Sequence, residues 1–187
     1  MNDWYRPISG RFPRVSGSDQ VVAVLESLRG VWDEDAVDEF DHACQSAALA
    51  VADGADDGLV LAAALHDVGH SPLLADGSRA HDVIARDWLA PRFGARVGWL
   101  AGAHVAAKRY LVATRPGYGQ TLSAVSVASL ACQGGAAADV EFARHPWWPD
   151  ALRLRAYDDA AKQPGAPGIE LDALIGIAER LAVAAGR

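Results

Sequence analysis

The fold is predicted from residues 59–70, which read Leu59-Val60-Leu61-Ala62-Ala63-Ala64-Leu65-His66-Asp67-Val68-Gly69-His70. The first seven of these residues are apolar, and a helix that is apolar on every side is typical of the centre of a helical protein. We therefore predict a central helix from about Asp56 to His66, which Gly69 and Pro72 bring to an end. Because the chain leaves helical geometry there, the side chains of His66 and Asp67 can both turn towards one metal ion.

Apolar residues recur at helical spacing along the rest of the chain, whereas the alternation of a half-buried strand is scarce. The chain is therefore predicted to be all-α. On the helix that follows Asp35, the buried face is predicted to run from Val37 to Val51. Besides the central one, the predicted helices cover residues 18–30, 35–53, 79–89, 95–112, 121–130 and 149–161, and a last helix follows the 164–168 loop and ends near Gly186.

The length of 187 residues, of which 51% are hydrophobic, suits a single domain with one core. We predict one domain over residues 1–187, with residues 1–17 as an N-terminal extension. A formal net charge of −7 disfavours nucleic acid as the main partner. The longest apolar run is too short to span a membrane, and no signal-peptide pattern is present, so a cytoplasmic protein without an obligate protein partner is expected.

The cysteines give no sign of a metal site, whereas the histidines do. Cys44 and Cys132 form no metal-binding or disulfide pattern and are predicted to be reduced thiols in the core. In contrast, five of the six histidines fall between His42 and His104. A single histidine among aliphatic residues is more often a satisfied core residue than a ligand. Four on successive predicted helices, together with two carboxylates, are better explained by a metal site, and these residues are His42, His66, Asp67, His81, His104 and Asp158.

The order of these six residues resembles the HD-domain superfamily, helical metalloproteins mostly known as phosphohydrolases. Three further segments are similar to a more specific family, the mixed-valent di-iron oxygenases that cleave carbon–phosphorus bonds. The resemblance covers most of the chain from about Val31 to Lys162. The three segments are Gly102-Ala103-His104-Val105-Ala106-Ala107-Lys108-Arg109-Tyr110-Leu111-Val112, Gln133-Gly134-Gly135 and Leu154-Arg155-Ala156-Tyr157-Asp158.

The resemblance implies an all-α HD-domain bundle with a buried site for two iron ions, Fe(II) and Fe(III), and dioxygen as co-substrate. It implies that Asp67 bridges the two ions. One ion would be held by His42, His66, Asp67 and Asp158, and the other by His81, His104 and the shared Asp67. Imidazole and carboxylate donors suit iron, in agreement with this assignment.

The resemblance also implies a small-molecule phosphonate as substrate, bound by His70, Lys108, Ser126 and Arg155, with Asp67, His70 and Lys108 taking part in catalysis. Lys108 follows the ligand His104 by four residues and Arg155 precedes Asp158 by three, so each cation lies on the same helix face as a ligand. A guanidinium can hold phosphonate oxygens with two parallel hydrogen bonds.

The chain departs from the family pattern before His42. Relatives that act on a primary amine have a Tyr that occupies an iron site and a Glu that receives the ammonium, where this chain has Trp32 and Asp35. Indole cannot bind iron. An Asp is one methylene shorter than a Glu, and a Trp can recognise a quaternary ammonium through a cation–π contact. Trp32 and Asp35 are therefore predicted to bind the substrate. Together they make a substrate with a trimethylammonio group a serious alternative to one with a free amine.

The resulting hypothesis is oxidative cleavage of the carbon–phosphorus bond of a 1-hydroxy-2-(trimethyl)aminoethylphosphonate, with release of phosphate and glycine or glycine betaine. The alternatives are a metal-dependent phosphohydrolase acting on a small phosphate ester and a non-catalytic HD module. Outside the site, Arg109 and Tyr110 are predicted to support packing. His145 is predicted at the surface, and packing is favoured over a role in covering the pocket for Trp147 and Trp148.

Overall fold

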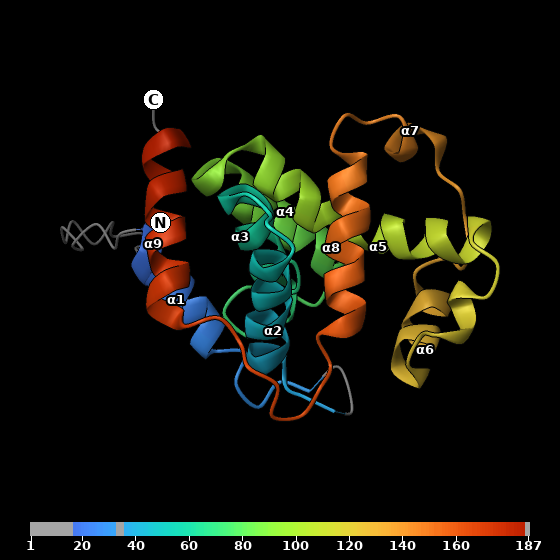
Figure 1. Ribbon diagram of the computed structural model, residues 1–187, viewed down its shortest axis with the longest axis horizontal. Coiled ribbons are helices and arrows are strands. Elements are labelled where there is room, and N and C mark those ends of the chain that lie inside the picture. Colours follow the sequence, from blue (N-terminus) through green and yellow to red (C-terminus); the bar gives the residue numbers. More distant parts are fainter. Residues whose placement is uncertain (1–16, 33–35, 186–187) are drawn as a thin grey trace, which may run out of the picture.

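The computed structural model describes residues 17–32 and 36–185, and every regular element within these ranges is helical (Figure 1). The all-α prediction is confirmed. Two short 3₁₀ turns, η1 (Val68–His70) and η2 (Tyr118–Gln120), lie between α-helices. The α-helices are α1 (Gly17–Glu26), α2 (Glu39–Ala52), α3 (Asp57–Leu65), α4 (His81–Phe93), α5 (Ala95–Thr114), α6 (Ala124–Cys132), α7 (Val140–Ala143), α8 (Trp148–Ala160) and α9 (Leu171–Ala185).

Helix α3 is the central element, as the sequence predicts. Every residue from Gly58 to Leu65 is buried, because α2, α5, α8 and α9 all pack against it (Figure 1). The side chain of Asp56 caps the helix by accepting a hydrogen bond of 2.9 Å from the amide of Leu59. Since the helix ends inside the core, the residues that follow it are delivered to the interior of the bundle.

Two glycines allow the elements around the site to approach closely. A Cβ atom on Gly69, in η1, would lie 2.2 Å from the carbonyl oxygen of His81 at the start of α4. A Cβ atom on Gly98, in α5, would lie 2.6 Å from the Cβ atom of Ala90 in α4. Because only hydrogen fits at these positions, η1, α4 and α5 come together.

Several boundaries and burial predictions need correction. Helix α2 begins at Glu39, later than predicted, because the Asp38 side chain caps it through the amide of Asp41. Val51 was predicted in the core but is 51% exposed, since it lies in the last turn of α2 at the rim of a groove next to α9. Cys132 was also predicted in the core and is exposed at the end of the peripheral helix α6, whereas Cys44 is buried.

The segment between α6 and α8 was not predicted to contain a helix, and it forms the short α7. It contributes to an aromatic cluster in which His145 stacks on Trp99 with ring centroids 3.9 Å apart, so His145 is half-buried rather than at the surface. Trp148 is buried and meets Tyr110 edge-on, and Trp147 meets Trp99, which supports packing for both tryptophans.

Arg109 also supports packing, as predicted, because its Nε donates a hydrogen bond of 2.8 Å to the carbonyl of Gly135. None of the helices described is both long and apolar enough to cross a lipid bilayer.

Candidate metal centre and anion pocket

Three buried histidines of the predicted ligand set have a fixed tautomer. The Nδ1 atoms of His42, His66 and His104 lie 2.9, 2.8 and 2.6 Å from backbone carbonyl oxygens, which can only accept a hydrogen bond. Each Nδ1 therefore carries the proton and donates it in this hydrogen bond. In the neutral ring, Nε2 then has a free lone pair that can bind a metal ion. The three carbonyls belong to Ala161, Ala63 and Ala101, respectively.

The two oxygens of Asp67 face two different pairs of histidines. Oδ2 lies 3.0 Å from Nε2 of His66 and 3.6 Å from Nε2 of His42. Oδ1 lies 3.4 Å from Nε2 of His104 and 3.6 Å from Nε2 of His81. This is the arrangement that a carboxylate bridging two metal ions requires.

Asp158 joins the first pair of histidines. Its Oδ1 lies 3.6 Å from Nε2 of His42, and its Oδ2 lies 3.5 Å from Nε2 of His66. It comes from α8, whereas the histidines come from α2 and the end of α3, so three elements meet at this half of the cluster. Arg155, three residues earlier on α8, contacts Oδ2 of Asp158 through Nη1 at 2.6 Å.

Burial and mutual charge set the protonation of the cluster. Burial lowers the pKa of His104 to about 3 and also lowers the pKa of His42, so both rings are neutral at neutral pH. For His66, burial acts in the same direction, but Asp67 and Asp158 outweigh it and raise the pKa well above its usual value. Burial disfavours the charge on these two carboxylates, yet their basic neighbours hold both pKa values well below the usual range. The cluster therefore attracts a cation, either a proton on His66 or a metal ion.

The donor set fits metal ions. The ligand atoms form two groups, each within 4.8 Å of one another, and Asp67 belongs to both; the groups are His42, His66 and Asp67, and Asp67, His81 and His104. Within the described part of the chain, the buried Oδ1 of Asp67 accepts no hydrogen bond. The facing Nε2 lone pairs of His42 and His66, 3.4 Å apart, also need a cation between them.

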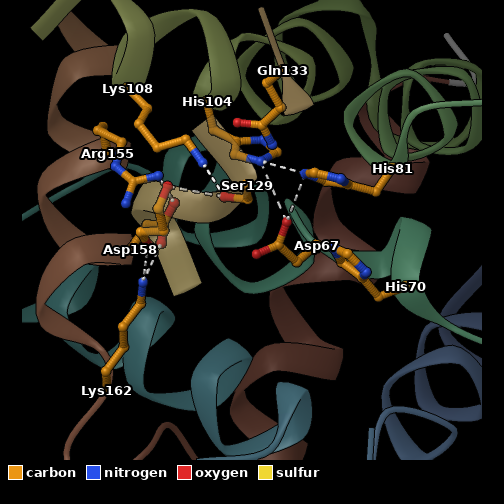
Figure 2. Close-up of a pocket in the computed structure, with 11 residues that line it drawn as sticks. Asp67, His70, His81, His104, Lys108, Ser129, Gln133, Arg155, Asp158 and Lys162 are labelled. Carbon is orange, nitrogen blue, oxygen red and sulfur yellow. Dashed lines mark hydrogen bonds and ion pairs between the residues drawn. The ribbon is translucent and has the colours of Figure 1, made fainter. Parts of the chain in front are cut away.

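A polar pocket adjoins the second histidine pair (Figure 2). Its cavity measures about 30 Å³. Lys108, which is only 4% exposed, donates a hydrogen bond of 2.9 Å from Nζ to Oγ of Ser129. Lys162 lies on another side of the pocket, with Nζ 3.2 Å from Oγ of Ser126 and 3.8 Å from Oδ1 of Asp158.

Lys108, Arg155 and Lys162 thus bring three cations to one pocket (Figure 2). Burial, and then repulsion by Arg155, lower the pKa of Lys108. The ion pairs of Arg155 with its neighbouring carboxylates outweigh its burial and raise its pKa above the usual value. An anion among these groups would offset their repulsion, and a dianionic group with several oxygens could contact all three.

The remaining predicted residues lie at different distances from this pocket. His70 lines it and stacks on His81 with ring centroids 4.4 Å apart, and the buried Ser126 also lines it. Trp32 is 64% exposed and is not among the lining residues. Asp35 lies outside the described residues.

Sequence reasoning missed three residues of the lining, which are Ser129, Gln133 and Lys162. Gln133 was part of a segment used for the resemblance but received no role. Its Oε1 atom is buried and has no hydrogen-bond partner among the described residues, so it can accept a hydrogen bond from a ligand. Lys162 follows Asp158 by four residues, just past the end of α8, and this spacing is the signal that could have identified it.

Comparison with known proteins links this geometry to an activity. The chain is 36% identical over 144 residues to hydroxymethylphosphonate dioxygenase of Gimesia maris, and the aligned region covers 71% of this chain and 71% of that protein. It is 30% identical over 158 residues to [1-hydroxy-2-(trimethylamino)ethyl]phosphonate dioxygenase (glycine-betaine-forming) of Leisingera caerulea, covering 75% of this chain and 81% of that protein. An uncharacterised protein of Acanthamoeba polyphaga mimivirus is 35% identical over 136 residues, covering 66% of this chain and 62% of the viral protein. No family model matches the chain.

Proposed function

The chain belongs to the HD-domain phosphonate dioxygenase family, and we propose that it cleaves the carbon–phosphorus bond of a small 1-hydroxyphosphonate with dioxygen and two iron ions. The observation that carries this proposal is the position of three cationic side chains beside a carboxylate shared by two histidine pairs. The reaction balances as one hydroxyphosphonate and one dioxygen giving one carboxylic acid and one phosphate.

The protein would hold one iron ion through His42, His66 and Asp158 and the other through His81 and His104, with Asp67 between them. When bound as an Fe(II)/Fe(III) pair, the ions supply the redox chemistry with dioxygen. The backbone carbonyls that fix the imidazole tautomers hold the rings in the orientation that ligation requires.

The phosphonate would lie against Lys108, Arg155 and Lys162, with Ser126 and His70 completing its hydrogen bonds. Held in this way, its carbon would face the four proposed metal ligands that line the same pocket, which are Asp67, His81, His104 and Asp158. Lys108 would stabilise negative charge on the phosphorus oxygens while the bond to carbon breaks, since it is buried and donates from one defined direction. We assign Gln133 to the hydroxyl group, because its buried Oε1 needs a donor.

The group on the hydroxylated carbon is the finer part of the proposal. Cleavage of the amino substrate would give glycine, and cleavage of the trimethylammonio substrate would give glycine betaine. Recognition of either cationic group would depend on Trp32 and Asp35. The exposure of Trp32 weakens this assignment. Among the described lining residues, the carboxylates are Asp67 and Asp158, both assigned to metal. Hydroxymethylphosphonate, which would give formate and phosphate, is therefore the second candidate, because it brings no further positive charge to three cations.

The test is a parallel measurement of oxygen uptake and phosphate release with hydroxymethylphosphonate and with the amino and trimethylammonio substrates. We expect one phosphate per dioxygen with at least one of them, and phosphate release without oxygen would contradict the proposal. If Asp35 receives a cation, Asp35→Ala lowers kcat/KM about tenfold for the two ammonium substrates and leaves hydroxymethylphosphonate unchanged. An equal effect on all three would exclude that role.

The ligand set alone would also serve a phosphohydrolase. Membership in a family of oxygenases supports the oxidative reaction instead, and we retain neither the phosphohydrolase nor the non-catalytic module as a candidate.

A further inference from the structure

Arg155 is held by two neighbouring carboxylates of its own helix. Its Nη1 lies 2.6 Å from Oδ2 of Asp158. Its Nε donates a hydrogen bond of 3.0 Å to Oδ1 of Asp159, and its Nη2 contacts the same oxygen. The guanidinium is 2% exposed, so these contacts fix its orientation inside the protein.

Asp159 is itself held by a residue from a distant part of the chain. The hydroxyl of Tyr118 donates a hydrogen bond of 2.5 Å to Oδ2 of Asp159. Tyr118 is buried and begins η2, directly after Gly117, whose positive φ of 84° makes the turn. Burial raises the pKa of Tyr118, which keeps the phenol protonated as a donor. The segment after α5 therefore determines where the Asp159 carboxylate lies.

The sharing of Arg155 between two acids matters for the site. A guanidinium has five N–H groups, and the contacts with Asp158 and Asp159 leave some of them for a ligand in the pocket that Arg155 lines. If Asp159 were neutral, Arg155 would pair with Asp158 alone and would draw this carboxylate away from His42 and His66.

We propose that Asp159 and Tyr118 are positioning residues, which orient Arg155 towards the phosphonate and keep Asp158 available as a metal ligand. This inference rests on the proposed function. Of the three residues in this chain of contacts, only Arg155 lines the anion pocket. Tyr118 and Asp159 belong neither to the metal-ligand groups nor to the lining of that pocket, and the inference gives them a role.

The experiment compares Asp159→Asn and Tyr118→Phe with the wild-type protein loaded with iron. We expect KM for the phosphonate and Kd for inorganic phosphate, measured by calorimetry, to rise about tenfold or more in Asp159→Asn. Tyr118→Phe should shift both in the same direction by a smaller factor, and kcat should change less than KM in each. Asp159→Glu, which keeps the charge, should recover part of the affinity.

The chain provides a matched control on the same helix. Tyr157 donates a hydrogen bond of 2.5 Å to Oδ2 of Asp53, and Arg153 pairs with that oxygen at 2.8 Å. This second Tyr–Asp–Arg chain of contacts does not line the pocket. Asp53→Asn and Tyr157→Phe remove the same kinds of contact from a more exposed position on α8 and should leave KM and the Kd for phosphate unchanged.

The outcomes separate the inference from the function on which it rests. If Asp159→Asn raises KM and the Kd for phosphate no more than Asp53→Asn does, the positioning role is wrong. If the wild-type protein neither binds phosphate nor consumes oxygen with a hydroxyphosphonate, the proposed function itself fails. Should Asp159→Asn not fold, Tyr118→Phe and Asp159→Glu decide the question, because each changes less of the buried network.

Discussion

The imidazoles of His66 and His104 share a local hydrogen bond that leaves Nε2 free to bind a metal ion. Each donates from Nδ1 to the carbonyl three residues earlier in its own segment, at 2.8 and 2.6 Å. A helix can therefore set the tautomer of its own histidine without help from another element. The position of the histidine can be predicted from the sequence, whereas the tautomer follows from the side-chain rotamer and required the structure.

Lys108 tests the pocket at the level of one side chain. Its ammonium is buried next to Arg155, and burial and this repulsion both lower its pKa. Lys108→Met removes a cation from the pocket but keeps the bulk, so we expect KM for the phosphonate to rise about 10- to 100-fold. The free energy of unfolding should not decrease, because a repelled buried charge is lost. Steady-state kinetics and denaturant unfolding measure the two effects.

Arg180→Met is the control for Lys108→Met, because it removes an exposed cation paired with Asp57, outside the pocket. It should leave KM unchanged. A KM for Lys108→Met within about twofold of the wild-type value would contradict the assigned role, since even one hydrogen bond to a charged group contributes more than that.

The two cysteines offer a second test at the residue scale. Burial raises the pKa of Cys44 to about 11, whereas Cys132 is exposed. At pH 8 the Cys44 thiol is therefore protonated and shielded, and we expect iodoacetamide to modify Cys132 alone in the native protein. Mass spectrometry after labelling should find one adduct in the native protein, none in native Cys132→Ser and two in the unfolded wild-type chain. Rapid labelling of Cys44 in native Cys132→Ser would contradict its burial.

At the scale of elements, the sequence predicted what depends on local pattern. The apolar run of α3 and the order of the ligands could be read from neighbouring residues, whereas the Asp38 cap that sets the start of α2 was not identified. Ser129 and Gln133 could not be assigned, because they reach the pocket only through the placement of the peripheral helix α6, where Ser129 accepts a hydrogen bond from Lys108 of α5. The exposure of Val51 and Cys132 has the same cause, since helical spacing identifies one face but not the element that covers it.

The close approach of η1 and α4 gives a test at this scale. In Gly69→Ala the new Cβ atom would meet the backbone of His81 at 2.2 Å, and backbone cannot move aside as a flexible side chain can. We expect α4 to shift, the free energy of unfolding to fall by about 1–3 kcal/mol, and the iron content to decrease as His81 leaves His104. Elemental analysis and thermal unfolding measure both changes.

Gly119→Ala is the matched control for Gly69→Ala, because a Cβ atom there would lie 3.5 Å from Val112, an ordinary contact. It should bind the full amount of iron and unfold at nearly the wild-type temperature. Full iron occupancy in Gly69→Ala would mean that the start of α4 need not be held against η1 for the second histidine pair to bind metal.

For the whole molecule, the formal net charge of −7 hides a strongly uneven distribution. Lys108 and Lys162 are the two lysines of the chain, and both line the anion pocket together with Arg155. The other basic side chains are arginines, and several of those described at the surface pair with nearby acids, as Arg96 does with Asp56 and Asp150. Among the described residues, this pocket brings together three cations that a small dianionic substrate can contact, which favours a specific small ligand over a broad polyanion.

This distribution makes lysine chemistry a probe of a single site. Burial lowers the pKa of Lys108, so a larger share of its amine is unprotonated and nucleophilic near neutral pH. Reductive methylation keeps the positive charge but replaces N–H donors with methyl groups, so we expect it to lower phosphonate turnover, and inorganic phosphate to slow the loss by covering Lys108 and Lys162. Peptide mass spectrometry locates the modified residues. Lys162→Arg should remain sensitive through Lys108, whereas inactivation at the same rate with and without saturating phosphate would show that the two lysines do not share an anion site.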